Sequence, residues 1–168
     1  PSLLNANEIN KIINQLYKFY NIESNIEITL EANPDDLSSE YLIQLRNTPI
    51  NRLSIGVQSF DQEDLQFMNR AHSASEAKSS ILKAQDKGFE NLTIDLIFGS
   101  PTSNLKKWEQ NLDTFFSLNI PHLSAYSLTV EEGTRLAHDI RKGKVKRLED
   151  NLALAQYNQL QNAIKDNG

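Results

Sequence analysis

Four apolar segments, each carrying a polar residue near its end, constrain this chain more than any other feature. In residues 26–34, Ile26, Ile28 and Leu30 alternate with polar residues, and the segment ends in polar residues and a proline. Such alternation predicts a β-strand. Three further segments of this kind cover residues 53–59, 92–99 and 122–131. Apolar strands that each deliver a polar group near one end predict a site that is assembled from several strands.

The segments between these strands have the pattern of helices. Asn5 and Glu8 have the spacing of a reciprocal N-terminal cap, and Ser73 with Glu76 repeats that spacing. Ser38 is placed to cap another helix. Strand and helix alternate with no hairpin signal, which predicts parallel strands joined by helical crossovers.

The fold class that we predict is α/β, an incomplete parallel (β/α) TIM-like barrel of about four strands with flanking helices. Four strands cannot close an eight-stranded barrel, and a helix precedes the first strand although a βα series begins with a strand. The chain also begins at Pro1 without an initiator methionine, so we expect an internal fragment of a longer protein. We expect residues 1–131 to form the partial barrel core, and residues 132–168 to form a basic linker and a helix that starts at about Leu148.

The composition narrows the classes of function. The 168 residues carry a formal net charge of −5, which argues against nucleic acid as a partner because phosphate binding requires an excess of Lys and Arg. No apolar run reaches the roughly 20 residues of a transmembrane helix, and no secretory signal is present, so we expect a cytoplasmic protein. The chain has no cysteine and three histidines. It therefore cannot supply a disulfide, a thiolate nucleophile or the thiolate ligands of a zinc or iron–sulfur site.

Four polar residues are candidates for the site. They are Glu31 and Gln58 at strand ends, Arg70 in a connection that follows, and Asp95 inside an apolar run. In parallel α/β folds, ligands bind at the carboxyl ends of the strands. Taken singly, each residue has a structural alternative, such as a solvated strand end for Glu31 or a hydrogen bond to a neighbouring backbone amide for Asp95. Together, two acids, an amide and a guanidinium suit a zwitterionic, hydroxylated ligand.

His72 and Thr129 are further polar residues near the predicted strand ends. His72 follows Arg70 by two residues in a polar break, where a histidine is usually exposed or locally hydrogen-bonded. Thr129 ends the fourth strand, ahead of a Glu-Glu-Gly-Thr turn. The chain contains no phosphate-binding loop, nucleophile elbow or dinucleotide glycine fingerprint, so these common catalytic templates are excluded.

Five motifs, in order along nearly the whole chain, resemble the oxygen-independent coproporphyrinogen III oxidase family of radical S-adenosylmethionine (SAM) proteins. They are Glu-Ala-Asn-Pro at 31–34, Arg-Leu-Ser-Ile-Gly-Val-Gln-Ser-Phe at 52–60, Asn-Arg-Ala-His at 69–72, Asp-Leu-Ile-Phe-Gly at 95–99 and His-Leu-Ser-Ala-Tyr-Ser-Leu-Thr-Val-Glu at 122–131. Within that family, Glu-Ala-Asn-Pro, Arg-x-His and Tyr-Ser-Leu-Thr-Val-Glu-x-Gly-Thr resemble the haem chaperone branch more than the true oxidase.

The resemblance implies a partial TIM-like barrel of the radical SAM type, with SAM and a [4Fe–4S] cluster as cofactors. It implies SAM contacts for Glu31, Gln58, Arg70, Asp95 and Thr129, and a haem contact for His72. For the full-length protein it implies either a haem chaperone that passes haem to an acceptor protein, which we favour, or a true oxidase that decarboxylates the propionate side chains of a porphyrinogen. An unrelated βα-barrel enzyme of sugar or amino-acid metabolism is a third alternative.

Two parts of the family pattern are missing from the chain. The three cluster cysteines, spaced C-x3-C-x2-C, and the glycine-rich strand end that contacts the methionine portion of SAM belong upstream of Pro1. We therefore expect this piece by itself to bind no cluster and to have no radical activity. We also expect the uncovered parallel edge of the sheet to offer a surface for dimerisation.

Overall fold

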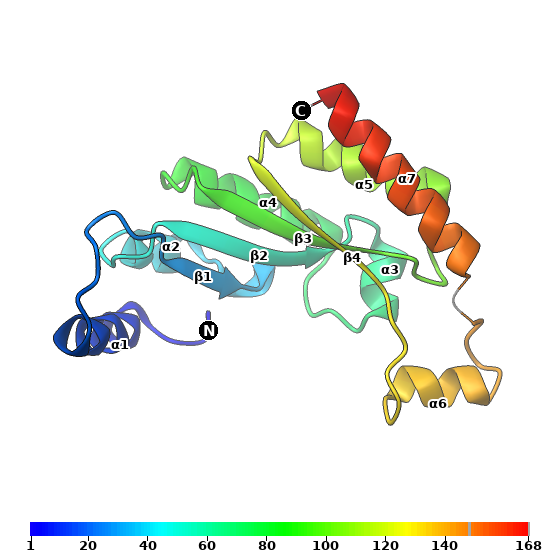
Figure 1. Ribbon diagram of the computed structural model, residues 1–168, viewed down its shortest axis with the longest axis horizontal. Helices are drawn as coiled ribbons and strands as arrows, with labels where there is room; N and C mark the ends of the chain where they lie inside the picture. Colours follow the sequence, from blue (N-terminus) through cyan, green and yellow to red (C-terminus); the bar gives the residue numbers. More distant parts are fainter. Residues whose placement is uncertain (148, 168) are drawn as a thin grey trace.

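The computed structural model describes residues 1–147 and 149–167, and its centre is a four-stranded parallel sheet (Figure 1). The strands are β1 (Thr29–Ala32), β2 (Arg52–Gln58), β3 (Leu92–Phe98) and β4 (His122–Ser127). Each strand pairs in parallel with the next, in the order β1-β2-β3-β4. β1 and β4 are therefore the two edges, and the described strands do not close into a barrel. This confirms the predicted α/β class and the incomplete parallel barrel.

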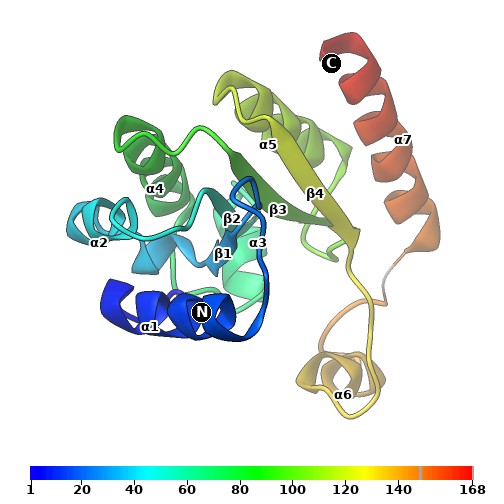
Figure 2. The same cartoon turned by 60° about the vertical axis from the view of Figure 1, so that its left-hand side comes forward.

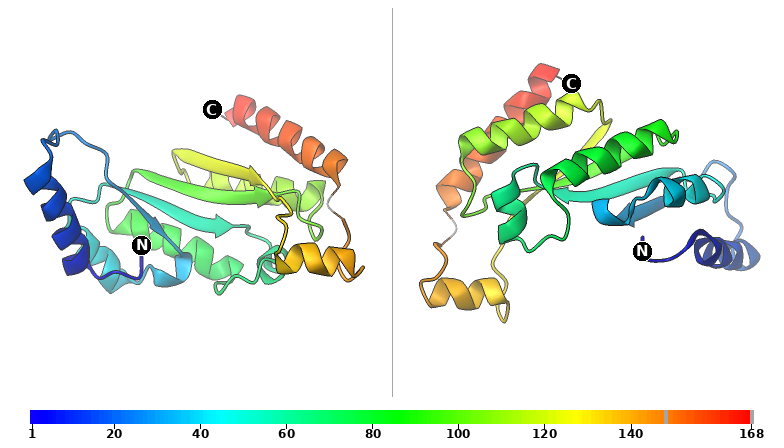
Figure 3. Two further views of the ribbon diagram at one scale, coloured as in Figure 1. Left: turned by 60° about the horizontal axis from the view of Figure 1, so that its bottom comes forward. Right: turned by 180° about the vertical axis from the view of Figure 1, so that it is seen from behind.

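Helices connect the strands, and three of them cover one face of the sheet (Figures 2 and 3). They are α1 (Ala6–Phe19), α2 (Ser39–Leu45), α3 (Gln62–Phe67), α4 (Ala74–Asp86), α5 (Leu105–Ser117), α6 (Arg135–Arg141) and α7 (Asp150–Asn167), with a 3₁₀ helix at Pro34–Asp36. The covering layer consists of α2, α4 and α5. The predicted reciprocal caps at Asn5 and Ser73 are both formed, and Ser38 caps α2.

The two faces of the sheet differ because successive side chains of a strand point in opposite directions. Six apolar residues of β2 and β3 are fully buried: Leu53, Ile55, Val57, Leu92, Ile94 and Leu96. They belong to one core with Ile81 of α4 and Trp108 of α5. The residues that alternate with them include Ser54, Gly56 and Asp95, which line a cavity on the other face. Strand periodicity therefore separates the core face from the face that can bind a ligand.

β1 is shorter than the predicted strand over residues 26–34. The side chain of Asn51 takes the place of a neighbouring strand, since its Oδ1 accepts from Ile28 N at 2.8 Å and its Nδ2 donates to Ile26 O at 2.8 Å. Backbone pairing with β2 begins only at Thr29, opposite Arg52. Ile26 is 40% exposed as a result of lying before the paired part of the strand.

The segment predicted to be a basic linker contains the helix α6. Thr134 begins this helix, with its Oγ1 accepting from Ala137 N at 3.2 Å. α6 has only seven residues, which is shorter than the window of about 11 residues or more over which apolar periodicity indicates a helix. The final predicted helix is present as α7, and Leu148, where it was predicted to start, lies outside the described residues.

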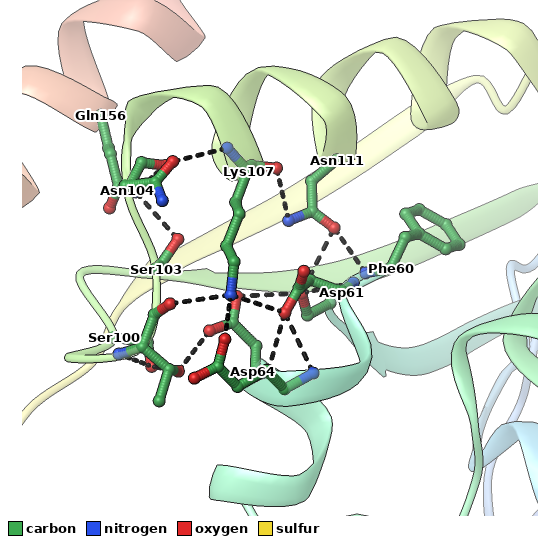
Figure 4. Close-up of polar contacts among 12 residues, drawn as sticks. Phe60, Asp61, Asp64, Ser100, Ser103, Asn104, Lys107, Asn111 and Gln156 are labelled. Atoms are coloured by element: carbon green, nitrogen blue, oxygen red, sulfur yellow. Dashed lines mark hydrogen bonds and ion pairs between the residues drawn. The ribbon is translucent and has the colours of Figure 1, made fainter.

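Gln156 of α7 joins that helix to the connection between β3 and α5 (Figure 4). Its Nε2 donates to Ser103 Oγ at 3.1 Å and to Asn104 O at 3.2 Å, and its Oε1 accepts from Gly99 N at 2.7 Å. Trp108 Nε1 donates to the Gln156 carbonyl at 2.9 Å. A buried amide with all of these bonds fixes the position of α7 along α5. No helix within residues 1–147 and 149–167 has the length and apolarity needed to cross a membrane.

Candidate functional site

Four of the predicted site residues line one cavity on the open face of the sheet. The cavity has a volume of about 300 Å³. Glu31 comes from β1, Gln58 from the end of β2, Asp95 from β3, and Arg70 from the connection between α3 and α4. Side chains from three strands and one connection therefore meet, as parallel strands that end at the same edge of a sheet allow.

Arg70 is held in this cavity by two hydrogen bonds. Its Nη2 donates to Asn33 Oδ1 at 2.9 Å and to Gly56 O at 3.3 Å. The side chain forms no other hydrogen bond or ion pair with the described residues. A guanidinium with spare N–H donors can bind a carboxylate through two parallel bonds.

Gln58 reaches the cavity from a distorted strand end. The pairing of β2 with β3 shifts between Ile55 and Gln58, so that β2 has one residue more than β3 over this interval. Gln58 has a φ of 68°, and this left-handed conformation costs a residue with a Cβ atom about 1 kcal/mol or more. Bulges and strained backbone of this kind are typical of places where a strand directs a side chain into a site.

Because Gly56 has no side chain, the amide of Gln58 can lie directly over its backbone. A Cβ atom at position 56 would lie 2.9 Å from Gln58 Nε2 and 3.5 Å from Arg70 Nη2. A larger residue would therefore displace the amide. The missing side chain of Gly56 allows the amide and the guanidinium to lie next to each other over β2.

Asp95 and Glu31 give the cavity its acidic side. Burial raises the pKa of Asp95 above its ordinary value, the hydroxyl of Ser124 lowers it, and the Glu31 carboxylate raises it again. A cationic group or a hydroxyl donor of a ligand would favour the ionised form of Asp95. The cavity therefore combines two acids with one base, as a ligand of mixed charge requires.

A larger cavity, of about 720 Å³, adjoins the first one through Gln58 and Arg70, which line both. It lies between α3 and α6, and six apolar residues line it: Phe67, Met68, Ile97, Leu128, Leu136 and Val145. Arg135 and Asp139 of α6 line it as well and form an ion pair at 3.4 Å. This size and lining are typical of a binding site for an apolar small molecule with a few polar groups.

Thr129 and His72 lie outside the residues that line these two cavities. Thr129 is exposed and lies two residues beyond the end of β4. His72 is 2% exposed, and its Nε2 lies 3.0 Å from Val57 O. The imidazole is thus enclosed by protein with Nε2 bonded to the backbone and Nδ1 3.7 Å from Asp35 Oδ1, and the haem contact of His72 stays a prediction.

Other residues join the smaller cavity although the sequence patterns did not single them out. They are residues 1–3, Ala32, Asn33, Ser54 and Gly56. The sequence does contain an indication for Gly56, because a glycine inside a strand often marks a bulge or a place where another group approaches the backbone closely. The role of Asn33 depends on its contact with Arg70, which no local pattern predicts.

The chain by itself does not fit an iron–sulfur cluster. Its sequence has no cysteine, and cysteine thiolates are the usual ligands of such clusters. Within residues 1–147 and 149–167, no group of three or more His, Asp or Glu side chains could hold a metal ion.

An open parallel βα sheet with a polar cavity on the face opposite α2, α4 and α5 defines a partial βα-barrel protein. The model of the radical SAM superfamily matches residues 3–115. The chain belongs to the radical SAM superfamily, which removes the alternative of an unrelated βα-barrel enzyme.

Individual relatives agree with this membership. The chain is 37% identical over 146 residues to heme chaperone HemW of Bacillus subtilis (strain 168), a match that covers 86% of this chain and 38% of the relative. It is 31% identical over 168 residues to radical S-adenosyl methionine domain-containing protein 1, mitochondrial, of Mus musculus, covering 100% of this chain and 38% of the relative. The structure of coproporphyrinogen III oxidase (HemN) from Escherichia coli, a radical SAM enzyme, superimposes with a TM-score of 0.85 at 24% identity, over 100% of this chain and 38% of that chain. The last similarity shows a shared fold, and the chain spans less than half of the length of each of these proteins.

Proposed function

We propose that the smaller cavity binds SAM and that the chain supplies the SAM-binding part of a longer radical SAM protein. The observation that carries this proposal is the convergence of Glu31, Gln58, Arg70 and Asp95 on one cavity. SAM has an ammonium group, a carboxylate and a sulfonium, together with ribose hydroxyls and an adenine ring. A site with two acids, an amide and a guanidinium matches such a mixture of donors and acceptors.

Each side chain has a role that suits its chemistry. The carboxylates of Glu31 and Asp95 accept hydrogen bonds from the ammonium group or the ribose hydroxyls. Arg70 pairs with the carboxylate through the N–H groups that Asn33 and Gly56 leave unused. When SAM is bound it supplies the radical chemistry of the superfamily, and the residues described here bind and orient it.

Calorimetric titration of the full-length protein with SAM tests this proposal. We expect Asp95→Asn and Arg70→Gln each to weaken the affinity about tenfold or more, because each removes a charged hydrogen-bonding partner. Lys165→Gln, in the last turn of α7, is a control that should leave the affinity unchanged. Wild-type protein that binds SAM no more tightly than the two cavity variants would contradict the proposal.

We further propose that the full-length protein acts as a haem chaperone in the cytoplasm. The match to heme chaperone HemW supports this proposal, and so does the larger cavity, whose apolar lining and whose Arg135 suit a flat tetrapyrrole with carboxylate substituents. In this arrangement the tetrapyrrole lies beside SAM, because Gln58 and Arg70 line both cavities. A separate acceptor protein would receive the haem.

Haem titration and an enzyme assay distinguish the chaperone from the true oxidase. We expect the full-length protein to bind haem, detected as a change in haem absorption, and to leave coproporphyrinogen unchanged. Leu136→Glu, which puts a charge into the larger cavity, should weaken haem binding about tenfold or more. Turnover of coproporphyrinogen to protoporphyrinogen would assign the oxidase activity instead.

The cysteines that bind the cluster must lie outside these 168 residues, because the chain has none. We propose that the chain alone stays free of the cluster. Treatment with iron and sulfide should therefore yield no stable [4Fe–4S] absorption. Formation of such a cluster on the chain would refute this part of the proposal.

We also propose that the chain dimerises through the edge strand β1, which pairs with β2 alone among the described strands. An uncovered strand offers N–H and C=O groups to a second copy. Light scattering of the purified chain should give about twice the monomer mass, and Thr29→Pro should shift it to the monomer because proline cannot donate to a strand pair. A monomeric wild-type chain would rule this out.

A further inference from the structure

The end of β2 is held in a tight left-handed turn. Ser59 N donates to Val57 O at 2.9 Å across Gln58, whose φ is 68°. A hydrogen bond between residues two apart around a positive φ is the rarer and more strained form of γ-turn. Glycine adopts a positive φ without steric cost because it has no Cβ atom, but glutamine does not. The left-handed conformation of Gln58 therefore persists only where the surrounding structure holds it.

His72 contacts the first residue of the turn. Its Nε2 lies 3.0 Å from Val57 O. A carbonyl oxygen only accepts, so this nitrogen carries the proton and donates it. The same buried oxygen accepts from Ser59 N. The imidazole therefore fixes the peptide group immediately before Gln58.

Asn111 of α5 contacts the residues that follow Gln58, and Figure 4 shows its side chain beside Phe60. Its Oδ1 accepts from Phe60 N and lies 3.3 Å from Ser59 Oγ. Asp64 Oδ2 also lies 3.3 Å from that hydroxyl, so the Ser59 proton can serve either acceptor. Asn111 is 2% exposed, and its Nδ2 donates to Lys107 O at 3.1 Å, which sets the orientation of the amide.

We infer that His72 and Asn111 are positioning residues that direct Gln58 at the ligand of the smaller cavity without touching that ligand. Both lie outside the residues that line the cavity. If either contact is lost, the backbone at Gln58 can relax from the left-handed region, and its amide then leaves the space over Gly56. This inference rests on the proposed binding of SAM, and it adds two residues that orient Gln58 for that binding.

A double-mutant cycle on the full-length protein tests the inference for His72. His72→Leu removes the donor, and we expect the affinity for SAM to fall about tenfold. In a Gln58→Ala background the same substitution should change the affinity less than about twofold, because His72 acts through Gln58. His72→Gln keeps an N–H donor and should restore the affinity to within about threefold of wild type. Equal losses in the two backgrounds would overturn the inference.

A second pair of variants tests Asn111. Asn111→Leu removes the acceptor and should lower the affinity about tenfold, whereas Asn111→Asp keeps an acceptor and should lower it less than about threefold. Ile81→Val, which removes one methylene from the core, is the matched control for lost stability and should leave the affinity unchanged. If Ile81→Val weakens SAM binding as much as Asn111→Leu does, general loss of stability explains the effect and the inference is wrong.

Hydrogen–deuterium exchange without ligand separates this inference from the proposal that SAM binds. We expect the Ser59 amide to exchange about tenfold faster in His72→Leu, and the Phe60 amide about tenfold faster in Asn111→Leu, while amides in the middle of β3 stay unchanged. Wild-type protein that binds no SAM would defeat the proposed function, but faster exchange in these variants would still support the held turn. Unchanged exchange at both amides would refute the positioning roles whatever the result with SAM.

Discussion

Arg70 and Asn33 join two distant parts of the chain, since Arg70 Nη2 donates to Asn33 Oδ1 at 2.9 Å. Asn33 follows β1 and Arg70 follows α3, so the bond ties the end of the first strand to the connection beyond the second. The same nitrogen lies 3.3 Å from Gly56 O. The guanidinium is therefore oriented over the cavity before a ligand arrives, which reduces the conformational entropy lost on binding.

Removal of the Asn33 acceptor should loosen Arg70. We expect Asn33→Leu to weaken SAM binding about tenfold, because the guanidinium loses one of its two anchors. Calorimetric titration measures the affinity. Asn47→Leu, at an exposed asparagine beyond α2, is the matched control, and equal losses in the two variants would speak against a role for the Asn33 contact.

The pKa of Asp95 should give the proposed SAM binding a pH dependence. Burial raises this pKa, and the neighbouring Glu31 carboxylate adds to the increase. Because the ionised form is the better partner for a cationic or hydroxylated ligand, the affinity should rise as the pH increases through the Asp95 pKa. In Glu31→Gln one source of the increase is gone, so the midpoint of the rise should move to lower pH. Titrations between about pH 4 and pH 8 measure it, and an unshifted midpoint would show that Glu31 does not act on Asp95.

Gly56→Ala should impair the site more than the fold. The added Cβ atom would lie 2.9 Å from Gln58 Nε2, and the end of a flexible side chain can move away, so we expect little loss of thermal stability but about tenfold weaker SAM binding. Gly88→Ala is the contrasting variant. Gly88 has a φ of 82° at the opposite end of the sheet, so alanine there should destabilise the fold by about 1 kcal/mol and leave SAM binding unchanged. Lower stability in Gly56→Ala together with weaker SAM binding in Gly88→Ala would contradict the roles given to these two glycines.

Asp64 lies in a polar cluster that links α3 to the connection before α5 (Figure 4). It is 1% exposed and accepts from the Thr102 hydroxyl. Burial raises its pKa, the Thr102 hydroxyl lowers it, and the Asp61 carboxylate raises it. Lys107 Nζ lies 3.1 Å from Asp61 Oδ1 and 2.6 Å from Glu63 Oε2, so its charge is shared with two other acids.

Asp64→Asn should change the pH dependence of stability. A carboxyl group whose pKa is raised in the folded state contributes stability fully below its unfolded pKa, and that contribution is lost as the pH rises through the folded pKa. Asparagine cannot ionise and suffers no such loss. The free energy of unfolding of the variant, relative to wild type, should therefore increase between about pH 3 and pH 7, as measured by urea denaturation. A difference that stays constant with pH would contradict burial of the charge.

Local patterns in the sequence were sufficient for much of the fold. β3 begins where the predicted segment 92–99 begins and ends one residue earlier, at Phe98, and the caps at Asn5, Ser38 and Ser73 are formed as their spacing predicts. Asp95 interrupts an apolar run because it lies on the cavity face of a strand whose other face is buried. These features depend on residues close to one another in the sequence, and short-range periodicity reports them.

Contacts between distant segments account for several features in which the structure differs from the predictions made from the sequence. Asn51 shortens β1 by occupying the hydrogen-bonding groups of Ile26 and Ile28, and no pattern within residues 26–34 reveals this. The helix α6 was not predicted because its seven residues are too few for a periodic apolar pattern to indicate a helix. His72 lies in a polar break that resembles an exposed loop, yet the fold encloses it against Val57.

The sequence by itself determined the alternation of strands and helices and the family motifs, and it predicted a set of residues for SAM binding. Only the tertiary structure decided which of them meet, bringing Glu31, Gln58, Arg70 and Asp95 to one cavity and leaving Thr129 outside it. It also decided how Gln58 is directed. A left-handed turn at a glutamine is unfavourable locally, so its presence depends on hydrogen bonds from segments far along the chain, and these exist only once the chain has folded.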